Sequence, residues 1–131
     1  MDYEEPDYMN KIDITVETFF IKEQSRVEDS FYVFAYRITI TNNGDIPARL
    51  MWRHWIIKDF NNKVLEVEGE GVIGEQPRIK PGKQFIYTSG TSLDTDVGTM
   101  KGTYTMKNDD GEEFEAIIGE FVLSAPQSQA H

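Results

Sequence analysis

Hydrophobic residues recur at every second position along much of this chain, and this period restricts the fold more than any other feature of the sequence. Successive side chains of a β-strand point to opposite faces, so a period of two predicts a strand with one buried face. The segments 11–18, 31–41 and 99–106 show the pattern. The side chains predicted to face the core are Ile12, Ile14, Val16, Tyr32, Phe34, Tyr36, Ile38, Ile40, Met100, Tyr104 and Met106.

Clusters of turn-forming residues separate these runs. Asn-Asn-Gly-Asp at 42–45, Asp-Phe-Asn-Asn-Lys at 59–63 and Asn-Asp-Asp-Gly at 108–111 each follow an apolar segment. Pro81 and Gly82 form a further break. The chain is therefore predicted to contain seven or eight short strands and no helix, which is typical of an antiparallel β-sandwich.

A length of 131 residues fits one domain. Residues 11–123 carry the strand pattern and are predicted to form the sandwich. Residues 1–10 are predicted to be an acidic N-terminal tail and residues 124–131 a polar C-terminal tail, and neither tail is expected to pack.

Charge and cysteine content exclude several classes of function. The chain has 23 acidic and 13 basic side chains and a formal net charge of −10, which disfavours nucleic acids and anionic membrane surfaces as partners. It has no cysteine, which rules out disulfides, thiolate metal sites and cysteine nucleophiles. No apolar run approaches the roughly 18 residues of a membrane helix, so we expect no membrane insertion and a cytoplasmic location.

Residues 69–74 spell Gly-x-Gly-x-x-Gly, the pattern of dinucleotide-binding loops. In those folds a helix follows the motif, and its N-terminus holds the pyrophosphate. Two prolines soon after the motif prevent a long helix here, and two nearby glutamates would repel a phosphate. Gly69, Gly71 and Gly74 are therefore predicted to serve a turn or bulge, through positive φ angles or a close backbone approach between strands. Phosphate binding through exposed amides is the alternative.

Arg53, His54 and Trp55 form a second candidate site. On a strand, Arg53 and Trp55 project to one side and His54 to the other. One interpretation packs Trp55 in or beside the core with Arg53 covering it, and places Trp52 off the main core face. The alternative is that the trio recognises an anion or a partner. A single strand histidine is weak support for a metal site, so the sequence assigns no metal ligands.

The sequence indicates neither catalysis nor a cofactor. It contains no Gly-x-Ser-x-Gly elbow, and His54 is the sole plausible base for the hydroxyl groups at 89–92. The carboxylates fall mostly in the tails and turns, where they are expected to be solvated. We therefore predict that the protein is not an enzyme.

One resemblance adds to this interpretation. The segments that carry it are 53–57, 69–77, 81–82, 85–90, 97–106 and 121–123, together with Gly111 and Phe114. In order and approximate spacing these segments resemble the ApaG family, also called CorD in bacteria, over nearly the whole chain. Thr91 and Asp96 depart from the family pattern, in which cysteine and proline are common, and both positions are expected to lie in loops.

The resemblance implies an immunoglobulin-like or fibronectin type III-like fold, so the prediction becomes an all-β antiparallel sandwich of that type with seven or more strands. It also implies an association with cobalt and magnesium efflux and no established enzymatic activity. Similar domains in F-box proteins serve protein interaction.

Three functional hypotheses remain open. The first is a non-catalytic interaction protein, a monomer or homodimer, that supports cobalt and magnesium homeostasis through a protein partner. The second is binding of a small phosphorylated or pyrophosphate ligand at residues 69–74. The third is direct binding of a divalent cation by clustered carboxylates.

Overall fold

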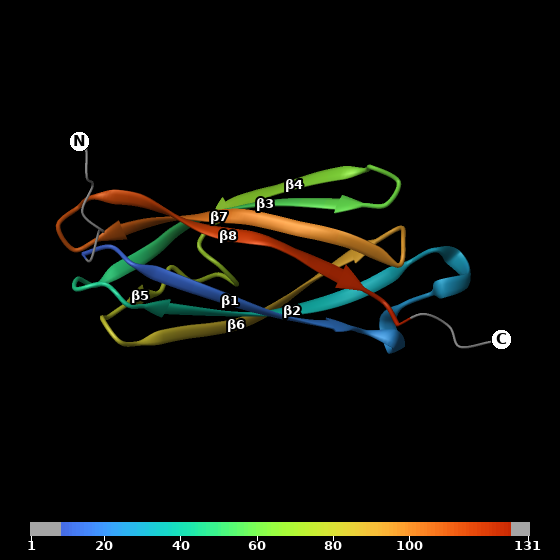
Figure 1. Ribbon diagram of the computed structural model, residues 1–131, viewed down its shortest axis with the longest axis horizontal. Helices are drawn as coiled ribbons and strands as arrows, with labels where there is room; N and C mark the ends of the chain where they lie inside the picture. The colour runs from blue at the N-terminus through green and yellow to red at the C-terminus, as the bar shows by residue number, and fades with distance from the viewer. Residues whose placement is uncertain (1–8, 127–131) are drawn as a thin grey trace, which may run out of the picture.

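Eight β-strands in two antiparallel sheets make up the computed structural model, which describes residues 9–126 (Figure 1). The strands are β1 Ile12–Phe20, β2 Tyr32–Asn42, β3 Ala48–Asp59, β4 Val64–Glu70, β5 Arg78–Ile79, β6 Gln84–Leu93, β7 Val97–Asn108 and β8 Glu113–Ser124. Two 3-10 turns, η1 Lys22–Gln24 and η2 Val27–Asp29, connect β1 to β2. Among the described residues no helix is long and apolar enough to cross a membrane. The predicted all-β sandwich is confirmed.

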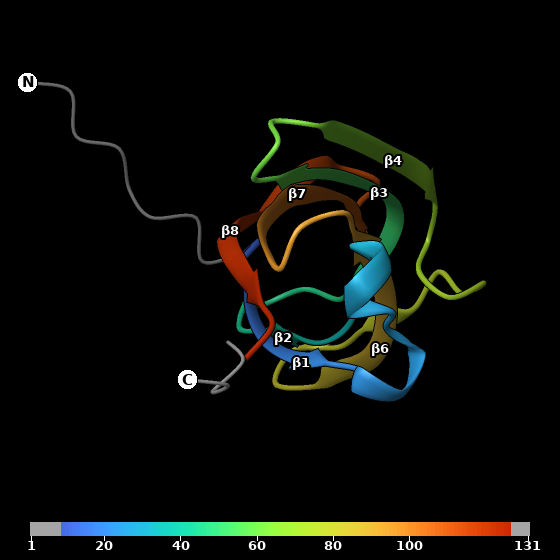
Figure 2. The ribbon, with the colours of Figure 1, turned by 90° about the vertical axis from the view of Figure 1, so that its right-hand side faces the viewer.

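The two sheets face each other across a shared interior. One sheet has the strand order β1-β2-β6, and the other has the order β4-β3-β7-β8 with β5 paired to the start of β3. The end-on view in Figure 2 shows the sheets wrapped around this interior, with β8 beside β1 at one side. The strands β4 and β8 form the two edges of the larger sheet.

The period-two pattern places the core as predicted. The alternate side chains of β2 and β7 are almost fully buried, and those of β1 are half-buried, because β1 is an edge strand. The buried side chains of the predicted set are Phe34, Tyr36, Ile38, Ile40, Met100, Tyr104 and Met106. These residues join apolar side chains of β3, β6 and β8 in one continuous core between the sheets.

Three turns are each organised by one buried polar side chain. Asn108 Oδ1 accepts hydrogen bonds from the amides two and four residues later, both at 3.0 Å. Asp59 Oδ1 does the same in the hairpin between β3 and β4, at 2.8 and 2.9 Å. Asn42 Oδ1 accepts from the amide of Gly44 at 2.9 Å. The turns predicted at 42–45, 59–63 and 108–111 are confirmed, and their first residues are buried because their side chains replace missing backbone partners.

Two expectations need correction. The packed chain extends beyond Leu123, because Ser124 ends β8 and the buried Ala125 donates its amide to the carbonyl of Asp96 at 2.8 Å. Thr91 lies within β6 and not in a loop, because β6 pairs with β2 over its whole length. Asp96 does lie in the bend between β6 and β7. Most of the two expected tails, residues 1–8 and 127–131, falls outside the described residues.

Aromatic side chains from both sheets meet at the centre of the core. Trp55 of β3 contacts Tyr36 of β2, with ring centroids 5.6 Å apart, and meets Tyr104 of β7 edge-on at 6.2 Å. The hydroxyl groups of Tyr87 and Tyr104 share a hydrogen bond of 2.5 Å. Burial raises the pKa of Tyr36, Tyr87 and Tyr104 above the ordinary value, because the phenolate form would lose its hydration.

These three tyrosines predict a loss of stability at alkaline pH. The unfolded chain releases their protons near pH 10, whereas the folded protein holds them to higher pH, so the stabilisation is complete below about pH 10 and falls above it. We expect the free energy of unfolding to fall by up to about 1.4 kcal/mol per pH unit for each tyrosine. Urea unfolding between about pH 9 and pH 12, with tyrosinate absorbance recorded in parallel, measures the effect. Ionisation of every tyrosine near pH 10 without loss of structure would contradict it.

Candidate functional site

The glycine motif forms a compact loop in which several amides are engaged in backbone hydrogen bonds. Val72 and Glu75 exchange backbone hydrogen bonds of 2.8 and 2.9 Å, and the amide of Gly71 donates to the carbonyl of Met51 at 2.9 Å. The element that follows is the short strand β5, not a helix. The amides of Gly71, Val72 and Glu75 are thus bonded within the protein, and the motif leads into a strand and not into a helix.

The three motif glycines have different roles. Gly71 and Gly74 have φ angles of 59° and 78°, as predicted. Gly69 does not have a positive φ, and its close neighbour is a side chain, which corrects the expected approach of two backbones. A Cβ atom at Gly69 would lie 2.8 Å from Nη1 of Arg53, so the glycine makes room for the guanidinium group.

Arg53 connects the motif to the core. It lies opposite Gly69 in the β3–β4 pairing, and its Nη1 donates to the carbonyls of Glu70 at 3.1 Å and Gly71 at 3.0 Å. Beside it is a cleft of about 210 Å³. The cleft is lined by Tyr36, Arg53, Trp55, Val72, Ile73, Gly74, Tyr87 and Ser89. One guanidinium group and three hydroxyl groups therefore border the same small space.

The two tryptophans lie on opposite faces of β3, as predicted. Trp55 is 2% exposed and belongs to the core, whereas Trp52 is 40% exposed on the outer face. The structure thus brings Arg53 and Trp55 together with the glycine loop and separates His54 from them.

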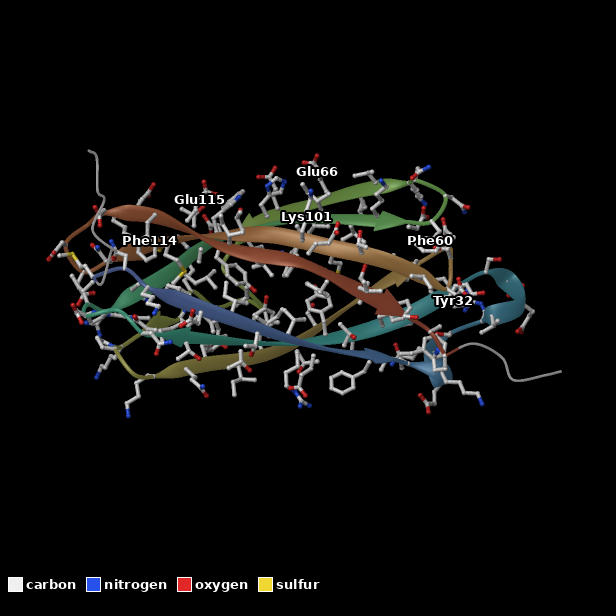
Figure 3. All side chains as sticks on the ribbon, in the orientation of Figure 1. Tyr32, Phe60, Glu66, Lys101, Phe114 and Glu115 are labelled. Atoms are coloured by element: carbon white, nitrogen blue, oxygen red, sulfur yellow. The ribbon has the colours of Figure 1, made fainter. Side chains whose placement is uncertain are left out.

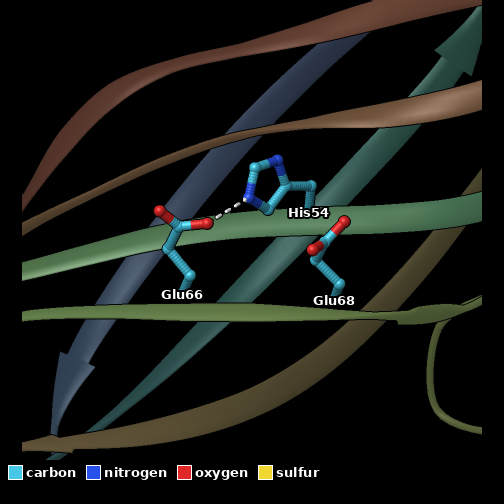
Figure 4. A group of neighbouring side chains, drawn as sticks. All are labelled: His54, Glu66 and Glu68. Atoms are coloured by element: carbon cyan, nitrogen blue, oxygen red, sulfur yellow. Dashed lines mark hydrogen bonds and ion pairs between the residues drawn. The ribbon is translucent and has the colours of Figure 1, made fainter.

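His54 instead meets two glutamates on the outer face of the larger sheet. The β3–β4 pairing places His54 directly opposite Glu68, with Glu66 two residues earlier in β4. His54 Nε2 lies 3.1 Å from Glu66 Oε2, and Figure 4 shows the imidazole between the two carboxylates. One ligand atom from each of the three residues lies within 4.8 Å of the others. We call these three residues the His54 cluster.

Sequence reasoning missed Glu66 and Glu68. The carboxylates were assigned to tails and turns, but these two lie within β4, where they share the outer face and Val67 between them points to the opposite face. The signal that could have revealed them is the glutamate at every second position of 66–70, in the strand that follows His54 across a hairpin.

A shallow apolar hollow lies on the same outer face. It has a volume of about 330 Å³ and is lined by His54 and Ile56 of β3, Thr103 of β7 and Ile117 of β8, and also by Lys101 and Glu120. Ile117 is 76% exposed. The hollow arises because Gly119 has no side chain and lies at a register shift between β7 and β8. In Figure 3 the labelled Glu66, Lys101 and Glu115 also project outward from this sheet, away from the core.

Comparison with known proteins gives consistent matches over most of the chain. Residues 22–108 match the family model described as the ApaG domain. The chain is 56% identical to Protein ApaG of Dechloromonas aromatica over 121 residues, which is 91% of this chain and 95% of that protein. It is 54% identical to Protein ApaG of Xylella fastidiosa over 119 residues, covering 91% and 94% of the two chains. A crystal structure of a candidate ApaA protein from Bordetella pertussis superimposes with a TM-score of 0.90 and 44% identity, covering 94% of this chain and 100% of the other.

Proposed function

The chain belongs to the ApaG domain family, and from this premise we propose that it is a non-catalytic protein that acts by binding a protein partner in the cytoplasm. Through this partner the protein supports the homeostasis of cobalt and magnesium, the role that the family resemblance implies.

The apolar hollow on the outer face of the larger sheet carries this proposal. Ile117 exposes most of its side chain next to Ile56, and the glycine beside it leaves a depression that a protruding apolar side chain can fill. Lys101 and Glu120 add charged groups to the lining of the hollow. An apolar centre with a polar rim is the usual composition of a protein–protein interface. A single exposed apolar side chain would not produce this composition.

The contacts of the polar side chains favour binding over catalysis. His54 has a carboxylate as its hydrogen-bond partner, not a hydroxyl group that it could activate. The buried hydroxyl groups of Tyr87 and Tyr104 bind each other, and burial raises the pKa of both further above the neutral range, which disfavours a role as a base. The polar groups of His54, Tyr87 and Tyr104 therefore make contacts within the fold.

Replacing Ile117 with glutamate is expected to abolish capture of the partner while the protein stays folded. A charged group in the centre of the hollow would lose its hydration in the complex, whereas in the free protein it stays in water. The expected change in unfolding free energy is within about 0.5 kcal/mol, because the position is exposed. Affinity capture from a bacterial extract, with the retained proteins identified by mass spectrometry, measures the loss.

Val122→Glu is the matched control, because Val122 is a similarly exposed apolar residue of β8 that does not line the hollow. It should capture the same protein as the unchanged chain. In a strain that lacks its own ApaG protein, the Val122→Glu chain should restore tolerance to cobalt and the Ile117→Glu chain should not. Equal capture and equal tolerance with both variants would show that the hollow is not the interface.

A second candidate function is the binding of a small phosphorylated ligand in the cleft beside Arg53. The observation that favours it is the guanidinium group next to the hydroxyls of Tyr36 and Ser89, a donor set suited to an anion. Against it, Nη1 of Arg53 already donates to two carbonyls. A thermal-shift measurement with pyrophosphate tests this candidate together with the glycine loop, as argued in the Discussion.

A further inference from the structure

We propose that His54, Glu66 and Glu68 form a binding site for one divalent transition-metal ion of the Ni²⁺, Co²⁺ and Zn²⁺ group. The site lies on the outer face of the larger sheet (Figure 4). It stands on the geometry of these side chains and does not depend on the existence of a protein partner.

The backbone pairing brings the three donors together. His54 and Glu68 are direct cross-strand partners, and Glu66 lies two residues before Glu68 on the same face of β4. Two ligands of one transition-metal ion lie roughly 3 to 3.5 Å apart, given metal–ligand bonds near 2.1 Å. The 3.1 Å between His54 Nε2 and Glu66 Oε2 already matches this separation, and all three donors lie within 4.8 Å of one another. Small rotations of the exposed carboxylates are enough to close the remaining gap.

The surroundings of the cluster hold its members in place. His54 is on β3, which is paired on both sides by β4 and β7, so its backbone is fixed within the sheet. Trp52 Nε1 donates to Glu68 Oε1 at 3.3 Å and orients that carboxylate from behind. Such outer contacts set the orientation of metal ligands and raise affinity.

Charge and donor type select the ion. Two carboxylates and a neutral imidazole offer two negative charges, which match one divalent cation, and Glu70 adds a third carboxylate to the same face of β4. Carboxylates aligned along one strand repel one another, so a cation between them is favoured. Imidazole is a good ligand for Zn²⁺, Ni²⁺ and Co²⁺, whereas Mg²⁺ prefers an octahedron of oxygen atoms. Three protein ligands leave further coordination positions to water or to a group from another molecule.

Calorimetric titration of the full chain with Zn²⁺, Ni²⁺, Co²⁺ and Mg²⁺ tests the proposal. We expect one transition-metal ion per chain and at least about 100-fold weaker binding of Mg²⁺. His54→Ala and Glu68→Gln should each weaken Zn²⁺ binding by roughly 10- to 100-fold. Co²⁺ and Ni²⁺ should also quench the fluorescence of Trp52, which touches Glu68, and this quenching should be lost in His54→Ala.

Two controls isolate the site. Glu115→Gln removes the same charge from the outer face of the same sheet but away from the cluster, and should bind Zn²⁺ as the unchanged chain does. His131→Ala removes the other histidine and should also leave binding unchanged. No saturable binding below about 1 mM Zn²⁺, equal binding by His54→Ala, or equal affinity for Mg²⁺ would each overturn the proposal. His54 also lines the apolar hollow, but these titrations contain no partner and do not depend on Ile117, so the metal site and the protein interface are tested separately.

Discussion

Replacing Trp55 with alanine is expected to lower the free energy of unfolding by about 3 to 5 kcal/mol. Trp55 is 2% exposed and lies where the two sheets meet. Its ring packs against Tyr36, Tyr104 and Phe121, with centroid distances of 5.6, 6.2 and 5.9 Å. Strands on both sides of the resulting cavity are fixed by their own pairing, so the surrounding side chains cannot collapse into it. Urea unfolding followed by circular dichroism measures the loss.

Trp52→Ala is the matched control, because it removes the same side chain from the opposite face of the same strand. Trp52 is 40% exposed, so we expect a loss within about 1 kcal/mol. Similar losses for the two variants would show that Trp55 does not have the structural role assigned here. A large loss of unfolding free energy for Trp55→Ala alone would mean that Trp55 serves the packing of the core. Arg53 and His54 would then be the residues of this segment that could recognise a ligand or partner.

Most of the fold could be predicted because it depends on local chemistry. The alternation in 31–41 fixes which side of β2 is buried, since only one of the two parities is consistently apolar. Asn42, Asp59 and Asn108 each begin a turn by accepting hydrogen bonds from amides a few residues later, so these turns are encoded within their own segments.

The strand order and the roles of the glycines could not be predicted from local sequence patterns. Gly69 looks like a backbone requirement in the sequence, but the pairing of β3 with β4 makes it the space into which the Arg53 side chain fits. The Arg53 cleft likewise requires β2 and β6 of the other sheet, which supply Tyr36 and Ser89. Contacts between sheets depend on how the whole sandwich closes, and no segment alone contains that information.

The His54 cluster lies between these two cases. A hairpin centred on Asn61 places His54 opposite Glu68, so the register follows from the turn that the sequence already predicted. The sequence did not reveal the cluster because the carboxylates were considered only as a total, without asking which of them share one face of a strand. Metal-ligand searches in β-proteins therefore need the hairpin register as well as the list of ligand residues.

Gly71→Ala is expected to destabilise the protein by roughly 2 to 4 kcal/mol, because two costs combine at this residue. The φ angle of 59° is unfavourable for a residue with a side chain, and the added Cβ would lie 2.0 Å from the carbonyl oxygen of Glu75. Relief of this clash would break the hydrogen bond from the Val72 amide to that carbonyl, and Val72 is buried in the core. Thermal and urea unfolding of the variant without any ligand measures the effect.

Gly74→Ala separates the two costs and completes the test of the glycine loop. Gly74 has a φ of 78°, but a Cβ there would meet no atom within 4 Å, so only the backbone strain of roughly 1 to 2 kcal/mol is expected. Melting curves of both variants and of the unchanged chain are then repeated with pyrophosphate. Because the amides of Gly71, Val72 and Glu75 are already bonded within the protein, we expect no shift in any of the three. The opposite result would be a shift of several degrees in the unchanged chain that is lost in Gly71→Ala, while the stability of Gly71→Ala without pyrophosphate equals that of the unchanged chain. That result would establish the loop as an anion site, because the substitution would then affect only the ligand-bound protein.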